Sequence, residues 1–303
     1  MTTSLSSSLI DECHSALVAG DVSPLDDFVM YLESIRRELS VEEWSAYIAD
    51  VIAPHPLRDL LHEEPFTRRA YQKPRGYAGD APMLDLVYAD ARPAELSDLG
   101  NRLYDWALPK PGAESVRARR EILAGIIDTV AAERPSPRIL SVACGHLREA
   151  QRSTAVRDGK IAELVALDQD RESLALVARE QSEFKVTPVQ ANIRRLLGGT
   201  SYGTFDLAYA AGLYDYLDES VAQMLTASMF RALRPGGLLV VANFAPDLPV
   251  IGYMEAVMDW MLRYRAESEV ERFAARLPRN EIAELTTFRD APGNVVYLSV
   301  RRS

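Results

Sequence analysis

The sequence predicts an α/β fold, in which a helical region precedes a doubly wound, mostly parallel β-sheet that ends in an antiparallel hairpin. Before about residue 137, apolar residues recur at helical spacing and convincing strands are scarce. After it, short β-rich runs alternate with helical stretches, which is typical of a parallel sheet covered on both faces. We therefore expect a helical domain over residues 1–136 and a sheet domain over residues 137–303.

The composition is globular and limits the classes of partner. Of the 303 residues, 48% are hydrophobic and 26% are charged, and the formal net charge is −10. Because a nucleic-acid backbone needs a basic surface, we expect no nucleic-acid partner. The N-terminus does not resemble a signal peptide, and no apolar run reaches the roughly 18 to 20 residues that span a bilayer. We therefore expect a cytoplasmic monomer or homodimer that binds a small molecule and no membrane.

Apolar faces, and residues that typically begin or end helices, predict the helices of the N-terminal region. Leu25–Leu39 and Val41–Val51 each place apolar residues on one face. Asp80 is a good N-cap for a helix that starts at Ala81, where the following proline is tolerated in the first turn. A longer helix is expected over about residues 114–132.

Seven short runs after residue 137 predict strands. The first five are separated mostly by helical stretches, and the last two are joined by the turn signal Asp290-Ala-Pro-Gly293, which predicts an antiparallel hairpin. The strands are expected at Arg138–Ala143, Glu163–Asp168, Lys185–Asn192, Phe205–Gly212, Leu238–Phe244, Glu281–Arg289 and Asn294–Arg301.

The turn after the first predicted strand contains the first candidate site residue, Gly145. Ligands of a doubly wound sheet bind at the carboxyl ends of the strands, and a glycine there lets a ligand approach the backbone. Asp168 ends the second predicted strand, where a carboxylate can accept hydrogen bonds from a ribose diol. Ala191 and Asn192 close the third strand and suit an adenine edge. The alternative for Gly145 and Asp168 is a tight turn and a surface aspartate.

In this order, these features resemble the class I S-adenosylmethionine-dependent methyltransferases. The resemblance covers about residues 137–303 and includes the later runs Phe205-Asp-Leu-Ala-Tyr209 and Leu233-Arg-Pro-Gly-Gly237. It implies an enzyme that uses S-adenosylmethionine as its cofactor. The expected cofactor-binding residues are Tyr77, Ala143, Gly145, Glu149, Asp168, Gln169, Ala191, Asn192, Ala210 and Gly212.

The first turn departs from the family pattern of an acidic residue followed by three alternating glycines. The four places are Ser141, Ala143, Gly145 and Leu147, so only the middle glycine is kept. The missing acid leaves open how a bound methionine amino group is held. Glu149 is one candidate to replace that acid, and an exposed acid in the first turn of a helix is the alternative reading.

A second resemblance lies in the helical region. The block Lys73-Pro-Arg-Gly-Tyr-Ala-Gly-Asp80, with Val116-Arg-Ala-Arg-Arg120 further on, looks like a bacterial subgroup described as 3-hydroxypalmitate methyl ester biosynthesis proteins. This resemblance implies a carboxylate oxygen of a (hydroxy) fatty acid, or of a related acid, as the favoured methyl acceptor. We expect the block to act as a lid, and a solvated turn between two helices is the alternative.

Cations and aromatic rings of this region are the candidates for binding the acceptor. Arg75 is the better carboxylate partner because its planar fork binds two oxygens at once, and Lys73 supplies a second cation. The stretch Ile251–Tyr264 has large apolar residues at helical spacing, which indicates core packing or a wall for an apolar tail. The expected substrate-binding residues are Tyr71, Lys73, Arg75, Trp106 and Trp260.

The catalytic candidates His146, Tyr214, Tyr216 and Asn243 lie near the ends of predicted strands. Packing is the alternative for the tyrosines, and a helix cap is the alternative for His146. A carboxylate acceptor is already ionised at pH 7 and needs no general base. A hydroxyl or amine acceptor would instead favour His146 or Asp215 as the base. The histidines and cysteines are scattered, so we predict no metal site.

Three functions stay open at this point. The first is methylation of a small acid, as the second resemblance implies. The next is another reaction that consumes the same cofactor, either N- or O-methylation of a different metabolite or cyclisation of the cofactor's own aminobutyryl arm. The third is a protein that binds the cofactor without catalysis.

Overall fold

The computed structural model describes residues 2–303 of the chain, with side chains from residue 9 onwards, and divides it into two compact units. Unit 1 contains the chain up to Val116 together with Asp247–Met261, and unit 2 contains Arg117–Pro246 and Leu262–Ser303. This division differs from the predicted boundary after residue 136. The N-terminal boundary falls inside one long helix, α8 (Pro111–Glu133), and a short segment near residue 250 belongs with the N-terminal helices.

Unit 1 is helical, as the sequence predicts. Helices expected around residues 25–39, 41–51 and 81–88 are present, although the second ends as a π-helical turn over Ile48–Ile52. Asp80 caps its helix by accepting the backbone N–H of Met83 at 2.9 Å. The α-helices are α1 (Thr2–Val18), α2 (Leu25–Glu38), α3 (Val41–Tyr47), α4 (Leu57–Leu61), α5 (Pro65–Gln72), α6 (Ala81–Tyr88), α7 (Asp98–Ala107) and α14 (Ile251–Ala256), with the first turns of α8.

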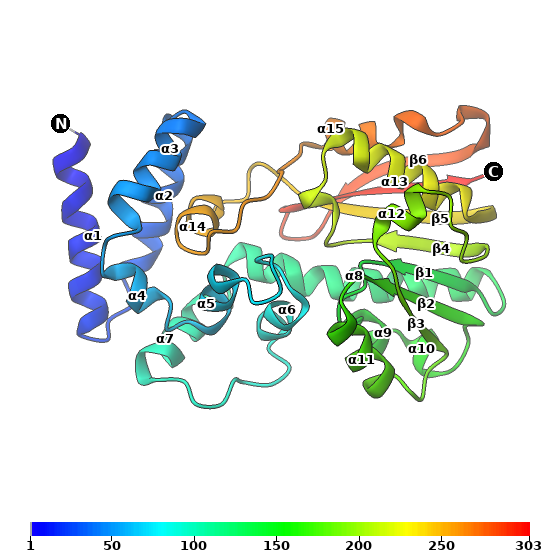
Figure 1. Ribbon diagram of the computed structural model, residues 1–303, viewed down its shortest axis with the longest axis horizontal. Helices are drawn as coiled ribbons and strands as arrows, with labels where there is room; N and C mark the ends of the chain where they lie inside the picture. The colour runs from blue at the N-terminus through cyan, green and yellow to red at the C-terminus, as the bar shows by residue number, and fades with distance from the viewer. Residues whose placement is uncertain (1) are drawn as a thin grey trace. The chain divides into compact units, whose positions relative to one another are not determined.

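The α14 segment joins unit 1 by packing closely on α2 (Figure 1). The backbone N–H of Gly252 donates to Glu33 Oε2 at 2.9 Å, and Glu255 accepts hydrogen bonds from Arg36 Nε at 2.9 Å and Trp44 Nε1 at 2.8 Å. Both carboxylates are buried, so these hydrogen bonds satisfy groups that are costly to desolvate. They hold a segment distant in sequence against the N-terminal helices.

The helical spacing of Ile251–Tyr264 is only partly realised. The helix α14 ends at Ala256, and the chain is irregular beyond it, with Asp259 in the left-handed region at φ 47°. Most of the apolar side chains are nevertheless buried, including Met258 and Trp260. The core-packing interpretation therefore describes this stretch, but a continuous helix does not.

Unit 2 contains a seven-stranded sheet in the order β3-β2-β1-β4-β5-β7-β6. All neighbours are parallel except β7, which runs antiparallel to both β5 and β6. Every strand expected from the sequence is present, and the terminal hairpin closes the sheet as predicted. The strands are β1 (Arg138–Val142), β2 (Glu163–Asp168), β3 (Val186–Gln190), β4 (Phe205–Ala210), β5 (Leu233–Phe244), β6 (Ile282–Arg289) and β7 (Val295–Arg302).

The run Leu233-Arg-Pro-Gly-Gly237 lies within β5, although the strand was expected to begin at Leu238. Phe205 pairs with Leu233, but Leu207 pairs with Leu238, so the intervening residues form an irregularity in the ladder. Gly236 has φ +72°, the backbone conformation that a type II turn requires at its second central position.

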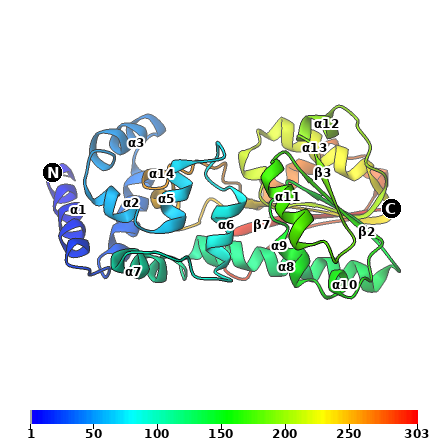
Figure 2. The same ribbon diagram turned by 60° about the horizontal axis from the view of Figure 1, so that its bottom comes forward.

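Helices cover both faces of this sheet. Figure 2 shows α12 and α13 on one side of it and α8 and α10 on the other. The apolar residues of β1, β2, β4, β5 and β7 pack against α13 in one continuous core. The helices of unit 2 are α9 (Arg148–Arg152), α10 (Thr154–Arg157), α11 (Arg171–Glu180), α12 (Ile193–Leu197), α13 (Glu219–Arg231), α15 (Glu267–Glu271), the rest of α8, and 3₁₀ turns at Tyr214–Tyr216, Arg272–Arg276 and Arg279–Glu281.

The C-terminal part of α8 is tied into unit 2 by Asp128. Its carboxylate accepts the hydroxyl of Ser153 at 2.6 Å and the backbone N–H groups of Thr154 and Ala155 at 3.1 and 2.8 Å. These bonds satisfy the free N–H groups at the start of α10. This part of α8 therefore belongs to the same compact unit as the sheet.

No helix in the described part of the chain is both long enough and apolar enough to cross a membrane.

Candidate functional site

The strand order of unit 2 places the candidate site at the carboxyl ends of β1 and β4. The chain builds β1, β2 and β3 in one direction across the sheet and then returns to add β4 on the other side of β1. The loops after β1 and β4 therefore lead away from each other. In open α/β sheets, ligands bind in the crevice at this switch point.

The turn after β1 has the backbone of a glycine-rich turn despite its sequence. Ala143, Gly145 and Leu147 all lie in the left-handed region, at φ 54°, 54° and 53°. Each non-glycine residue in this region costs about 1–2 kcal/mol. Gln181 supports the strained turn by donating from Nε2 to the carbonyl of Leu147 at 2.9 Å. The turn thus has three residues in the left-handed region, of which only Gly145 is a glycine.

Asp168 ends β2 beside this turn. One carboxylate oxygen accepts the N–H of Gly145 at 2.8 Å, and the other accepts the N–H of Asp170 at 2.9 Å. Burial raises the pKa of Asp168, while these backbone hydrogen bonds lower it. A carboxylate has about four lone-pair sites, so two of them remain for ligand hydroxyls. The structure therefore joins the two residues that the sequence singled out first.

The predicted adenine-binding residues lie together at the ends of β2 and β3. Asn192 donates from Nδ2 to Gln169 Oε1 at 2.8 Å, and its Oδ1 accepts the N–H of Arg194 at 3.0 Å as the N-cap of α12. The side chains of Gln169 and Asn192 are exposed, whereas Ala191 is buried and donates its N–H to the carbonyl of Asp168 at 2.8 Å. Asn192 thus has a structural task in addition to its predicted one.

Glu149 is a buried acid, which decides against the exposed-acid interpretation. The residue is 7% exposed, and its carboxylate accepts the hydroxyl of Tyr209 at 2.8 Å. Burial raises the pKa of Glu149, and the charges of Arg119 and Arg120 lower it. Tyr209 belongs to β4 and pairs in the sheet with Ser141, the position where the family pattern has its acid. An acidic group is therefore present beside β1, supplied from α9.

Arg119, a buried arginine of α8, lies at the end of β4, and the sequence did not single it out as a site residue. Arg119 Nη1 donates to the carbonyl of Ala211 at 2.5 Å, just beyond the predicted residue Ala210. A Cβ built on Gly212 would lie 3.7–3.9 Å from the guanidinium of Arg119. The only sequence signal is the block Val116–Arg120, whose arginines are equally compatible with ordinary ion pairs on a helix face.

Two of the predicted catalytic side chains have their polar atoms engaged in the core of unit 2. The hydroxyl of Tyr214 lies 2.9 Å from Thr226 Oγ1 and is fully buried. Asn243 donates to the carbonyls of Phe244 and Arg263 at 2.9 and 2.8 Å and accepts from Arg265 at 2.7 Å. These bonds fix the chain that follows β5. Both side chains therefore have structural partners, and their catalytic roles stay predictions.

The other candidates for catalysis are Tyr216, His146 and Asp215, which differ from Tyr214 and Asn243 in their exposure or in their hydrogen-bond partners. Tyr216 is 37% exposed at the end of its 3₁₀ turn, and His146 is 5% exposed in the turn after β1. Asp215 is buried, which raises its pKa to about 6, and it accepts the N–H of Phe244 at 2.7 Å. The catalytic roles of Tyr216 and His146 stay predictions.

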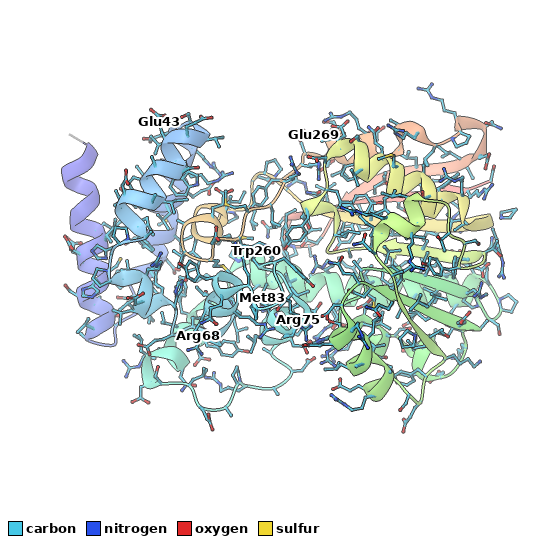
Figure 3. The ribbon with its side chains drawn as sticks, in the orientation of Figure 1. Glu43, Arg68, Arg75, Met83, Trp260 and Glu269 are labelled. Carbon is cyan, nitrogen blue, oxygen red and sulfur yellow. The ribbon has the colours of Figure 1, made fainter. Side chains whose placement is uncertain are left out.

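The block at residues 73–80 is an ordered connection within unit 1. Lys73 has φ 46° and ends α5, and its ammonium donates to the carboxylate of Asp259. Asp80 is fully buried and accepts two hydrogen bonds from Arg69, both at 2.7 Å. Arg75, labelled with Met83 in Figure 3, lies in the turn between these ends and is partly buried, as is Tyr77. The function of the block as a lid stays a prediction.

The predicted aromatic contacts of the acceptor occupy different environments in unit 1. Tyr71 is 37% exposed, with its ring 4.4 Å from that of His62. Trp106 is partly buried and donates from Nε1 to Asp26 Oδ1 at 2.9 Å. Trp260, labelled in Figure 3, is 8% exposed.

Within the described residues, no group of three or more histidine, cysteine, aspartate or glutamate side chains is arranged to hold a metal ion. The donor set at the strand ends of unit 2 instead fits S-adenosylmethionine. It comprises a carboxylate with lone pairs left for hydroxyl groups, two exposed amide side chains and a buried acid. The backbone at Gly212 carries no side chain that would block a ligand.

Comparisons with known proteins concern the domain and the fold. Residues 139–237, about a third of the chain, match the family model described as "Methyltransferase domain", and the matched span runs from β1 into β5. None of the curated proteins matches the sequence.

Two solved structures illustrate the likeness of fold. A possible exported protein from Bordetella parapertussis has a TM-score of 0.62 and 17% identity, over 87% of this chain and 99% of that one. Magnesium protoporphyrin IX methyltransferase from Synechocystis PCC 6803, with bound SAH, has a TM-score of 0.50 and 13% identity, over 78% of this chain and 98% of that one. At these identities the likeness establishes the α/β methyltransferase fold.

Proposed function

We propose that this chain, which carries a methyltransferase domain, transfers a methyl group from S-adenosylmethionine to a small-molecule carboxylate. The observation that supports cofactor binding most directly is the junction of Asp168 with the turn after β1, where the carboxylate accepts the N–H of Gly145 at 2.8 Å. Carboxylate, turn and amide side chains meet at the switch point of the sheet, where ligands of this fold bind.

The chain's own residues hold the cofactor in the following way. Asp168 accepts hydrogen bonds from the ribose hydroxyls, and Gln169 and Asn192 contact the adenine. Ala143, Gly145, Ala191, Ala210 and Gly212 supply backbone that a ligand can approach closely. Glu149 receives the ammonium of the amino-acid end, in place of the acid that is missing at position 141. When bound, the cofactor supplies an activated methyl group.

The proposed acceptor is a carboxylate because it is ionised at pH 7 and releases no proton when methylated. The chain then has to align the reactants and exclude water, which is sufficient for a large rate enhancement. Tyr214 and Asn243 have structural partners in unit 2, which supports a reaction without a base at those positions.

The more specific proposal is an acid with an apolar tail, such as a 3-hydroxy fatty acid. It is supported by the block at residues 73–80, with Arg75 as the partner of the acceptor carboxylate. Tyr71, Trp106 and Trp260 are the proposed contacts of the apolar part. Lys73 is the weaker candidate for binding this carboxylate, because its ammonium already pairs with Asp259.

The test is incubation of the protein with methyl-labelled S-adenosylmethionine and a homologous series of 3-hydroxy acids, followed by mass spectrometry. A labelled methyl ester, with yields that rise along the series until the binding region is filled, supports the proposal. A small cyclic amino acid, or labelled product only with hydroxyl or amine acceptors, would replace it by one of the other reactions. Tight binding with unchanged cofactor would indicate a non-catalytic protein.

A further inference from the structure

Arg119 is a buried cation at the carboxyl end of β4, entirely within unit 2. The residue is 7% exposed, and its one hydrogen bond goes from Nη1 to the carbonyl of Ala211. No carboxylate in the described part of the chain lies within 4.0 Å of its guanidinium. A guanidinium has five N–H donors in a rigid fork, so most of its hydrogen-bonding capacity is available to a ligand.

Two buried acids lie near enough to interact with Arg119 without contacting it. Its charge lowers the pKa of Glu149, on α9, and of Asp215, in the turn after β4. These long-range interactions offset part of the cost of burying the cation. Gly212 is exposed, and a Cβ there would be in van der Waals contact with the guanidinium, so the glycine leaves this side of Arg119 uncovered.

A purely structural role explains this arrangement poorly. A single carbonyl acceptor needs one donor, and a lysine or a neutral amide would satisfy it without burying a delocalised charge. A planar fork is suited to two oxygens that lie side by side, as in a carboxylate. The neighbouring Arg120 shows the contrast, because it is equally buried, at 6% exposed, but pairs with Glu121 at 3.2 Å.

We propose that Arg119 binds the carboxylate at the amino-acid end of the cofactor, an inference that rests on the proposed function. An α-amino acid carries an ammonium and a carboxylate on the same carbon. At this end of the sheet, the chain presents a buried acid, Glu149, and a buried guanidinium, Arg119. The pair is complementary to both charges of such a group. It also explains how the amino-acid end is held when position 141 is serine.

Two nucleoside ligands test the inference by equilibrium binding, without turnover. S-adenosylhomocysteine has the amino-acid end, and 5′-methylthioadenosine has the same adenosine and sulfur but lacks it. Calorimetry on the full chain should show that Arg119→Met weakens S-adenosylhomocysteine at least tenfold and leaves 5′-methylthioadenosine within twofold of wild type. Arg119→Lys keeps the charge and most of the buried stem, so this variant should fold normally. Its loss of affinity for S-adenosylhomocysteine should be smaller than that of Arg119→Met.

The matched control is Arg134→Met, which removes a partly buried arginine that directly follows the same helix and binds Asp206 and the carbonyl of Pro235, and it should leave the ratio of the two affinities unchanged. Equal weakening of both ligands in the folded Arg119 variants would overturn the inference, as would no weakening of either. So would retained S-adenosylhomocysteine affinity together with weaker binding of 3-hydroxypalmitate, which would assign Arg119 to the acceptor. If wild-type protein binds neither nucleoside, the proposed function itself fails.

Discussion

At the residue scale, Asp168 joins the turn after β1 to the end of β2 and keeps lone pairs for a ligand. We predict that Asp168→Ala weakens S-adenosylhomocysteine at least tenfold, because hydrogen bonds to a charged group contribute about 1.5–3 kcal/mol. Calorimetry measures the change. Because the ribose is present in both nucleosides, 5′-methylthioadenosine should weaken by the same factor, unlike in the Arg119 variants. Unchanged affinities in a folded variant would remove Asp168 from the site.

Glu64 is a second residue whose environment has a measurable consequence. It is fully buried in unit 1, where it caps α5 by accepting the N–H groups of Phe66 and Thr67 at 3.1 and 2.6 Å. Burial raises its pKa to about 7, although the hydrogen bonds from Thr67 and Phe66 oppose the rise. Between pH 4.5 and 7 the folded state therefore binds more protons than the unfolded state, so this group's contribution to stability is lost as the pH rises through that window.

We predict that Glu64→Gln flattens this part of the pH dependence. The free energy of unfolding of the variant should fall less between pH 4.5 and 7 than that of wild type. The three tryptophans, Trp44, Trp106 and Trp260, all lie in unit 1, so tryptophan fluorescence during urea unfolding monitors this unit selectively. The exposed Glu114→Gln serves as control and should reproduce the wild-type profile; a Glu64→Gln profile parallel to it would contradict the prediction.

At the scale of elements, the contact between α14 and α2 depends on a glycine. A Cβ on Gly252 would lie 2.7 Å from the carbonyl carbon of Leu32 and 2.8 Å from the backbone nitrogen of Glu33. Backbone atoms cannot move aside as a flexible side chain can, so the helices would have to separate. The hydrogen bond from Gly252 to Glu33 would then lengthen as well.

We predict that Gly252→Ala destabilises unit 1 by about 1–3 kcal/mol, as overpacking does. Urea unfolding followed by tryptophan fluorescence measures it. Gly125→Ala is the matched control, because Gly125 lies in the middle of α8 and a Cβ added there would have no atom within 4 Å. That substitution should stabilise the protein by roughly 1 kcal/mol, as judged by far-UV circular dichroism. Equal effects of the two substitutions would refute the close-contact argument.

At the scale of the whole molecule, the two compact units divide the proposed tasks. The proposed cofactor ligands lie in unit 2, apart from Tyr77, while the proposed acceptor ligands lie in unit 1. Because its net charge is −10, the chain as a whole repels an anionic acid electrostatically. Binding of such an acceptor therefore depends on local cations, of which Arg75 is the first candidate.

We predict that Arg75→Lys lowers turnover of a 3-hydroxy acid while the affinity for S-adenosylhomocysteine stays within twofold of wild type. Lysine keeps the charge but cannot bind two carboxylate oxygens in one plane. Arg75→Ala should in addition raise the KM for the acid. Steady-state kinetics with the acid series, alongside calorimetry, separates the two effects. Normal activity in Arg75→Ala would contradict the proposal of a fatty-acid acceptor, but it would not contradict the match to a methyltransferase domain.

The sequence by itself determined the seven strands and the main helices, and it singled out Gly145 and Asp168 as candidate site residues. Each of these follows from local information. Alternation of short apolar runs marks strands, Asp80 before a proline marks a helix start, and an acid at a strand end marks a ligand-facing position. Even the altered turn at Ala143 and Leu147 keeps its backbone, because the surrounding strands and Gln181 hold it there.

Only the tertiary structure decided which polar side chains are buried and what they contact. Arg119 and Arg120 are adjacent in sequence and equally buried, but within the described residues only Arg120 forms an ion pair with an acid at less than 4.0 Å. Tyr214 and Asn243 form buried hydrogen bonds within unit 2, and the α14 segment belongs to unit 1, where Glu33, Arg36 and Trp44 bind it. These outcomes depend on contacts between segments that are far apart in the chain. Such contacts decide whether a charge is desolvated and whether it is paired, so no local sequence pattern encodes either property.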